Sequence, residues 1–122
     1  DPVSLLLAIA GEGGEYLGTI SLKSIDKENG NAEYAISTRS KAHGSGIARR
    51  ATEDLLDFAF NVLGLHRVYL DVKESNGRAV SFYRKIGFVE EGCFREHLRD
   101  GDRFESLLWF AMTEDDHRRL TS

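Results

Sequence analysis

Cysteine, proline and tryptophan each occur only once in the 122-residue sequence, and there are four histidines. Because Cys93 is alone, it cannot form a disulfide within the chain, which is typical of a reducing compartment, so we expect a cytoplasmic protein. No apolar run approaches the roughly 18 residues of a membrane span. We therefore expect no membrane partner. The four histidines are scattered without metal-ligand spacing, so we expect no metal site. They are His43, His66, His97 and His117.

A positive net charge is also lacking. The formal net charge is −4, so nothing in the composition favours nucleic acid as a partner. With 41% hydrophobic and 30% charged residues, the composition is that of an ordinary globular chain. The length fits one domain with one core, and we assign residues 1–122 to it.

The first third of the sequence is typical of an antiparallel meander. We predict strands at Ser4–Ala10, Tyr16–Ile25 and Ala32–Ser37, the first of them buried because it is short and apolar. Asn29-Gly30 is a turn signal, because both residues tolerate a positive φ.

Helices and strands alternate in the next part. Ile47, Ala51, Leu55, Ala59 and Val62 recur at helical spacing, and Gly64 is expected just after the helix end. Arg67–Val72 is predicted as a strand, parallel to Ala32–Ser37 because a helix connects the two. A short helix follows, with Ala79, Phe82, Tyr83 and Ile86 on one face and Gly87 after its end.

The chain closes with a predicted hairpin, Cys93–Arg99 and Arg103–Met112, around the turn Asp100-Gly101. Trp109 and its neighbours are expected in the core. Residues Glu114–Leu120 are expected to form a polar, loosely held tail. The fold class is therefore α+β, with a mixed, mainly antiparallel sheet.

A glycine-containing loop, Lys41–Arg50, lies between the third predicted strand and the long helix. The amino-terminal end of a helix offers unpaired N–H groups and a positive dipole end, so the loop is a candidate phosphate site. It is not a P-loop, because no Gly-Lys-Ser/Thr ends it, and Arg49 stands where a dinucleotide fingerprint needs a third glycine. The alternative is a solvated helix start with two exposed arginines.

Two motifs resemble the Gcn5-related N-acetyltransferases. Lys41-x-x-Gly44-x-Gly46 is similar to that family's pyrophosphate loop, apart from lysine in the first place. Asn76-Gly77-Arg78-Ala79-x-x-x-Tyr83-x-x-x-Gly87-Phe88 is similar to its second, more distinctive motif. The likeness extends from about Ser4 to Met112 and is clearest to the branch of spermidine, ribosomal-protein and nucleotide-amino-sugar acetyltransferases.

The resemblance implies a twisted sheet whose central parallel pair of strands splays around acetyl-CoA. Members of the family usually begin with a strand and two helices that are missing here. We therefore expect the sequence, which opens with Asp1-Pro2 and no methionine, to be part of a longer protein. The mass of the natural gene product tests this expectation.

The resemblance also implies which residues bind the cofactor. The strand segment Ala35-Ile36-Ser37 would pair with the pantetheine arm, and one of its N–H groups could serve the oxyanion. Asn76 would contact the cofactor or an ordered water, and could also cap the short helix. The complete set is Ala35, Ile36, Ser37, Lys41, His43, Gly44, Ser45, Gly46, Ile47, Ala48, Arg49, Asn76 and Tyr83.

Two residues are candidates for proton transfer. Tyr83 is the candidate general acid, because a phenol of pKa about 10 remains protonated at neutral pH; the alternative is a core tyrosine. Glu33, which matches a family glutamate facing the acceptor, is the candidate base; the alternative is an exposed carboxylate or a cross-strand ion pair. Glu74, Asp71 and His97 are weaker candidates.

The function implied by the resemblance is N-acetyltransfer from acetyl-CoA to a primary amine by direct attack in a ternary complex. The acceptor would be a polyamine, an amino sugar, another small amine or a protein N-terminus. Two rival functions remain open, a non-catalytic acyl-CoA-binding module and a plain phosphate-binding or interaction domain. The edge of the Ser4–Ala10 strand and the final hairpin could also pair between chains, which would give a homodimer.

Overall fold

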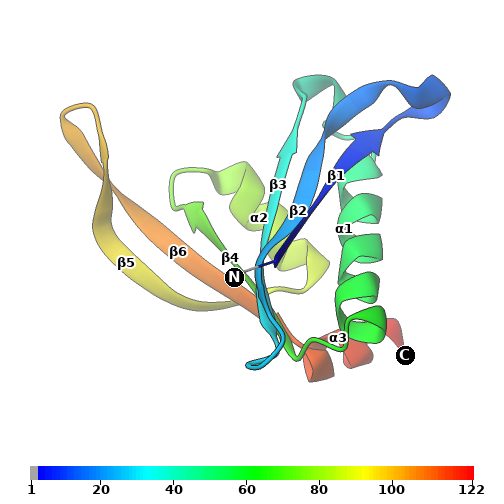
Figure 1. Ribbon diagram of the computed structural model, residues 1–122. Helices are drawn as coiled ribbons and strands as arrows, with labels where there is room; N and C mark the ends of the chain where they lie inside the picture. Colours follow the sequence, from blue (N-terminus) through cyan, green and yellow to red (C-terminus); the bar gives the residue numbers. More distant parts are fainter. Residues whose placement is uncertain (1–2) are drawn as a thin grey trace. The chain divides into compact units, whose positions relative to one another are not determined.

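The computed structural model describes residues 3–122 and forms two compact units, one up to Val68 and the other from Tyr69 onward. The first unit contains β1 (Val3–Ala10), β2 (Tyr16–Asp26) and β3 (Asn31–Thr38), which pair antiparallel in sequence order. Helix α1 (Ile47–Asp57) lies against one face of this meander (Figure 1). The predicted turn at Asn29-Gly30 is confirmed, with Gly30 at φ +73°.

The prediction that the first strand is buried is wrong. In β1 only Ile9 is buried, whereas Leu6 is 70% exposed and Val3 59% exposed. The strand stands at the edge of the sheet, so it has one pairing partner, and only part of one face meets α1. An apolar run by itself therefore does not reveal how much of its surface other elements cover.

The long helix differs from the predicted period at its end. Residues Phe58–Val62 form a π-helical segment, η3, in which the N–H of Leu63 donates to the carbonyl of Phe58 over 2.9 Å. This wider turn buries Phe60 and leaves Val62 69% exposed, so the prediction that Val62 continues the apolar face is wrong. Gly64, at φ +69°, ends the helix as predicted.

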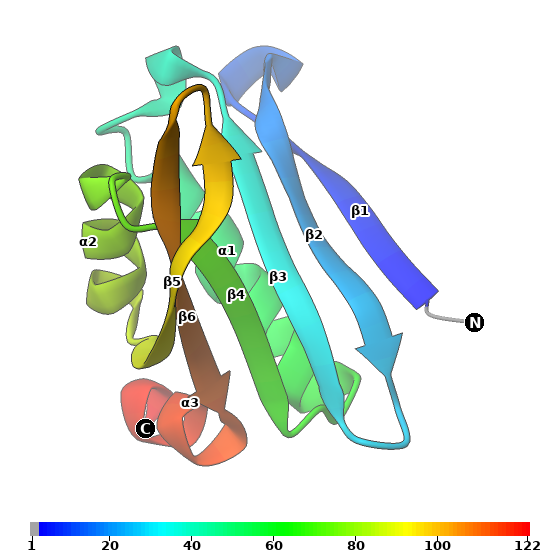
Figure 2. The ribbon, with the colours of Figure 1, turned by 90° about the vertical axis from the view of Figure 1, so that its left-hand side faces the viewer.

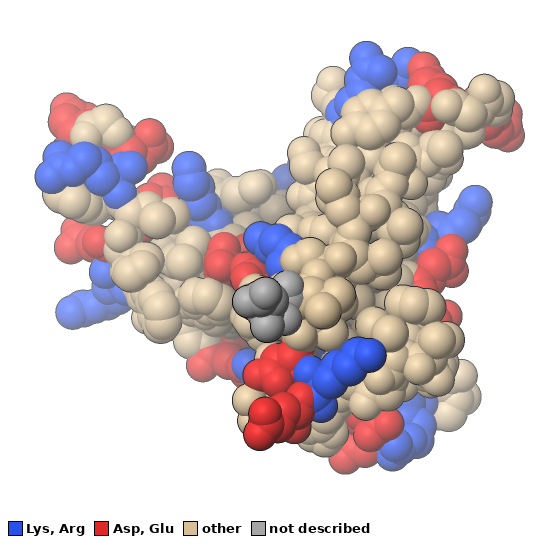
Figure 3. All heavy atoms as spheres, viewed as in Figure 1, with Lys and Arg blue, Asp and Glu red and all other residues tan. Residues whose placement is uncertain are grey.

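The second unit holds most of β4 (Arg67–Lys73), then α2 (Gly77–Ile86), β5 (Val89–Asp100), β6 (Arg103–Thr113) and α3 (Glu114–Thr121). Strands β5 and β6 form a long antiparallel hairpin, and α3 follows β6 (Figure 2). The turn predicted at Asp100-Gly101 is confirmed, with Gly101 at φ +64°. Charged side chains gather at the hairpin tip in Figure 3: Arg99, Asp100, Asp102 and Arg103.

The loosely held tail is also a wrong prediction, because residues from Glu114 onward form helix α3. A capping box begins it: Thr113 Oγ1 accepts the N–H of Asp116, and the Asp116 carboxylate accepts the N–H of Thr113. His117 is only 5% exposed, so the helix is anchored as well as capped. The polar composition of this stretch hid one inward-facing residue.

Taken as a set, the strands have the order β1-β2-β3-β4-β6-β5 in one mixed sheet with a parallel β3-β4 pair. Together with three α-helices, this confirms the predicted α+β class. That residues 1–122 form a single domain stays a prediction.

Candidate functional site

The glycine loop has the geometry that an anion site requires. Gly44 and Gly46 adopt φ values of +80° and +81°, in the left-handed region that favours glycine. Gly46 is also the residue at which α1 begins. A Cβ built on either glycine would meet no atom within 4 Å, so the space in front of this backbone is open.

Four main-chain N–H groups of the loop have no hydrogen-bond partner among residues 3–122: those of Gly44, Gly46, Ala48 and Arg49. By contrast, the N–H groups of His43 and Ser45 donate to Ser40 and Ala42 and so fold the loop. Unpaired donors at a helix start, where the dipole is positive, form a nest for an anion. The residues therefore fit the diphosphate of a nucleotide cofactor.

Two charged side chains of the loop, Lys41 and Arg49, have partners within the protein. Lys41 pairs with Glu15, and this hydrogen bond from the ammonium holds the pKa of Glu15 below its usual value. Arg49 pairs with Glu53 one turn along α1, at 3.3 Å. His43 is exposed, and Ile47 and Ala48 are partly exposed. Anion binding here would rest on the main chain, and the cations would add a local field.

Two groups of predicted residues lie on β3. Ala35, Ile36 and Ser37 pair with β2 and are partly or fully exposed. Glu33 stands opposite Lys23, with 3.9 Å between the Lys23 ammonium and a Glu33 carboxylate oxygen. The cross-strand ion pair, one of the two alternatives for Glu33, is therefore present, and its role as a base stays a prediction.

Asn76 begins α2 in the second unit. Its side-chain oxygen accepts the N–H of Ala79 at 3.2 Å, so the capping role is confirmed. The helix closes on Gly87, whose N–H donates to the carbonyls of Tyr83 and Arg84. The second motif thus fixes both ends of this helix.

Tyr83 occupies the middle of the same helix and is 8% exposed. Its ring meets the rings of Phe82, Phe88 and Phe110, with centroids 5.6, 6.0 and 6.5 Å away. Burial, and to a lesser degree the charge of Asp71, raises the pKa of the phenol above its ordinary value. Tyr83 is thus a core tyrosine in its packing, and the raised pKa keeps its proton in place at neutral pH.

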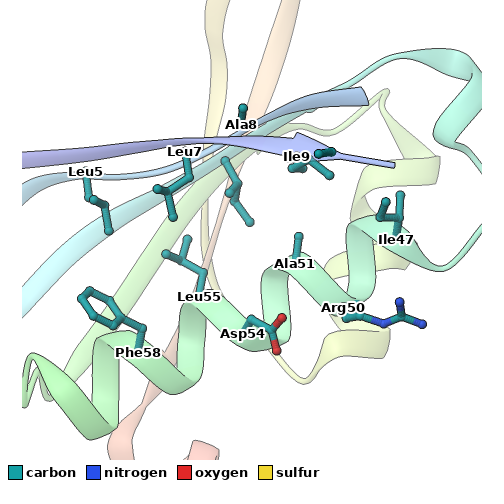
Figure 4. A pocket seen from close by; sticks show the side chains of 12 residues that line it. Leu5, Leu7, Ala8, Ile9, Ile47, Arg50, Ala51, Asp54, Leu55 and Phe58 are labelled. Carbon is teal, nitrogen blue, oxygen red and sulfur yellow. The ribbon is translucent and has the colours of Figure 1, made fainter. Parts of the chain in front are cut away.

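The sequence did not point to a groove between β1 and α1. Figure 4 shows Leu5 and Leu7 of β1 above Leu55 of α1 and Phe58 of the π-helical segment η3. The groove has a volume of about 550 Å³, and its charged lining consists of Arg50 and Asp54. Leu6 and Ala8 are apolar like the residues on either side of them, so the sequence carried no signal for the face of β1 that lines the groove.

Residues 3–122 contain no group of three histidine, cysteine, aspartate or glutamate side chains placed to hold a metal ion. None of their helices has both the length and the apolar character that crossing a membrane requires.

Comparison with known proteins gives a consistent set of relatives. A spermidine N(1)-acetyltransferase of Vibrio cholerae is 34% identical over 91 residues, which cover 75% of this chain and 53% of the relative. A Bacillus subtilis protein whose name provisionally describes a ribosomal N-acetyltransferase is 30% identical, over 81% of this chain and 54% of its own. The chain thus spans about half the length of the curated relatives it matches.

A solved structure shows the same fold. The dodecameric structure of spermidine N-acetyltransferase from Vibrio cholerae superposes with a TM-score of 0.90 and 26% identity, covering 100% of this chain and 71% of that chain. Similarity to spermidine and ribosomal acetyltransferases, predicted from the motifs, is confirmed, and the likeness to amino-sugar enzymes stays a prediction. Residues 1–88 match the family described as "Acetyltransferase (GNAT) family". The chain belongs to this GNAT acetyltransferase family.

Proposed function

We propose that the protein transfers an acetyl group from acetyl-CoA to a primary amine by direct attack in a ternary complex. One observation carries the proposal: four N–H groups without partners at the start of α1, with open space in front of Gly44 and Gly46. Bound acetyl-CoA supplies the activated acyl group. The loop would hold its diphosphate through the main chain, and β3 would pair with the pantetheine arm.

Two side chains would move protons. Tyr83 would donate its proton to the departing thiolate, since its raised pKa keeps the phenol protonated. Glu33 would accept a proton from the amine, because an alkylamine of pKa about 10.4 is mostly protonated at pH 7. For Glu33 to do so, the ion pair with Lys23 must open or a water must relay the proton.

The acceptor is an amine of the class that the relatives' names describe. Both of these names describe N-acetyltransferases, one of spermidine and one called ribosomal. We propose a polyamine as the preferred acceptor, with amino sugars and protein N-termini as other candidates.

We also propose that copies of the chain associate, as in the dodecamer named for the Vibrio cholerae relative. The outer edge of β1 and its exposed side chains Val3 and Leu6 offer an uncharged surface for pairing. Figure 3 shows few charged side chains over this strand. Light scattering should give a mass above that of one chain, and Leu6→Lys should lower it.

A second candidate function is a non-catalytic acyl-CoA-binding module. The packing of Tyr83 among three aromatic rings favours it, because a tyrosine in the core needs no part in proton transfer. Calorimetry with acetyl-CoA and an assay of thiol release with a panel of amines separate the two functions. Binding with thiol release supports the enzyme, binding without release supports the module, and no binding overturns both.

A further inference from the structure

An aromatic group lies on the sheet of the second unit. Trp109 of β6 is the chain's single tryptophan. Its ring centroid is 5.3 Å from that of Phe94 on β5 and 6.4 Å from that of Tyr69 on β4. The His97 ring stands edge-on to Phe94 at 5.2 Å. We name these four residues the aromatic corner.

The aromatic corner lies on the face of the sheet opposite α2. Side chains alternate along a strand, so Trp109 and Leu107 point away from Phe110, whose ring meets Tyr83 of α2. The buried residues Val68 and Leu70 flank Tyr69 in the same alternating manner. The corner is therefore separate from the packed side of the unit.

No side chain of residues 3–122 covers the strand position opposite Trp109 on this face of the sheet. Its cross-strand partner is Gly92, and a Cβ built there would meet no atom within 4 Å. Phe94 is 48% exposed. Trp109 was expected in the core, as Leu107, Leu108 and Phe110 are, but it is only partly buried. Its indole nitrogen is the buried side-chain polar atom in residues 3–122 that lacks a hydrogen-bond partner.

The rings of Phe94 and Trp109 carry no cation from residues 3–122. Other rings of the same hairpin do: the Arg99 guanidinium lies 4.7 Å from the Phe104 centroid, and that of Arg84 lies 5.8 Å from Phe110. The difference leaves two π-faces available to a cation from outside the chain.

Carboxylates flank the aromatic corner. Asp71 is exposed and follows Tyr69 on the same face of β4, with Lys73 next in that row. Glu105 shares the face of Trp109, and its carboxylate accepts the N–H of Ser75 at 2.8 Å. Charge and aromatic faces together are complementary to an alkylammonium ion.

We infer that the aromatic corner binds the second ammonium group of the amine acceptor. This inference rests on the proposed acetyl transfer to an amine. The reacting amine must be neutral, whereas a second amine of pKa about 10.4 stays protonated and can lie against Phe94 and Trp109. The protein thereby selects diamines and polyamines over amines with a single cationic group.

Kinetics with Phe94→Leu test this selection. The variant keeps an apolar side chain and loses the π-face, so KM for 1,4-diaminobutane should rise about two- to fivefold with kcat unchanged. KM for 1-aminobutane should not change, and Phe94→Tyr should behave as the wild type does. Phe104→Leu is the matched control: Phe104 is 52% exposed on the same hairpin but already lies beneath Arg99.

Equal KM values for 1,4-diaminobutane in Phe94→Leu and Phe104→Leu would overturn the inference, as would an equal rise with 1-aminobutane. A binding measurement separates this failure from failure of the proposed function. Because Trp109 is the sole tryptophan, its fluorescence should respond to 1,4-diaminobutane at constant ionic strength, and the response should weaken in Phe94→Leu. If the fluorescence of the wild type did not respond to 1,4-diaminobutane, the inference that the aromatic corner binds an ammonium group would be overturned. A fluorescence response without acetyl transfer to any amine would overturn only the proposed function.

Discussion

The glycine loop of the first unit and the Tyr83 region of the second unit differ in which part of the chain they offer to the proposed reaction. The loop offers main-chain groups, and the Tyr83 region offers a side chain. The loop presents main-chain N–H groups to open space and needs glycines for its shape. Tyr83 presents a side chain that three rings enclose and whose pKa burial raises. A binding function can thus be built from backbone geometry, whereas proton donation depends on a group that the surroundings keep protonated.

The largest expected effect tests the enclosed side chain. Tyr83→Phe should lower kcat by about 10²- to 10⁴-fold, because the general acid is lost while the ring packing remains. Binding of acetyl-CoA, measured by calorimetry, should be unchanged. If turnover stayed at the wild-type rate across the pH range, Tyr83 would be only a core residue.

Glu33→Gln should lower kcat about 10²-fold at neutral pH if Glu33 is the base. The loss should shrink as the pH rises toward the pKa of the amine, since the neutral amine then forms without help. Lys23→Gln is the matched control, because it removes the ion-pair partner and leaves the carboxylate. Identical pH–rate profiles for Glu33→Gln and the wild type would remove this role.

Gly46→Ala tests the main-chain side of the comparison. A Cβ at φ +81° strains the loop by about 1–3 kcal/mol, so the Kd for coenzyme A should rise about 5- to 150-fold. Gly64→Ala is the control, because Gly64 has φ +69° and equally open surroundings but lies outside the loop. Comparable losses of affinity in both variants would mean that backbone strain anywhere in the first unit lowers the affinity, and that the N–H groups of the loop do not bind coenzyme A.

The smallest effect concerns Asp116, which stabilises the start of helix α3 and has no part in the proposed chemistry. The N–H of Thr113 and, after it, Arg119 hold its pKa below the ordinary value of 3.8. The stabilisation is therefore present above pH 3.8 and is lost as the pH falls through the lower, folded-state pKa. Asp116→Asn should cost about 0.5–1 kcal/mol of unfolding free energy at pH 7, and denaturant melts should show the difference shrinking in acid. A difference that grew on acidification would contradict this account.

Local signals predicted the turns, the helix ends and the loop well, because each depends on a few neighbouring residues. Gly44, Gly46 and Gly87 needed positive φ, and Asn76 needed only the N–H of Ala79. How much of an apolar side chain other elements cover could not be predicted in the same way. Leu6 and Trp109 are as apolar as core residues, yet how much of each is exposed depends on segments far away in sequence.

Proton-transfer roles were only partly accessible from the sequence. The motif placed Tyr83 on a helix, but its three ring contacts come from Phe82 beside it and from Phe88 and Phe110 further along the chain. For Glu33, alternation along the strand could not reveal that Lys23 stands directly opposite. Such contacts arise from strand register and packing, which periodicity alone does not specify.

The π-helical segment Phe58–Val62 also bears on which deletions the fold tolerates. It holds one residue more than the α-helical path needs, so removing one position should let the turn close as regular helix. The segment after the cut would then keep its present direction, because the wider turn absorbs the extra residue that would otherwise rotate this segment by about 100° around the axis. A homologue that is one residue shorter in this segment should therefore bury the same apolar face without any change further along the chain.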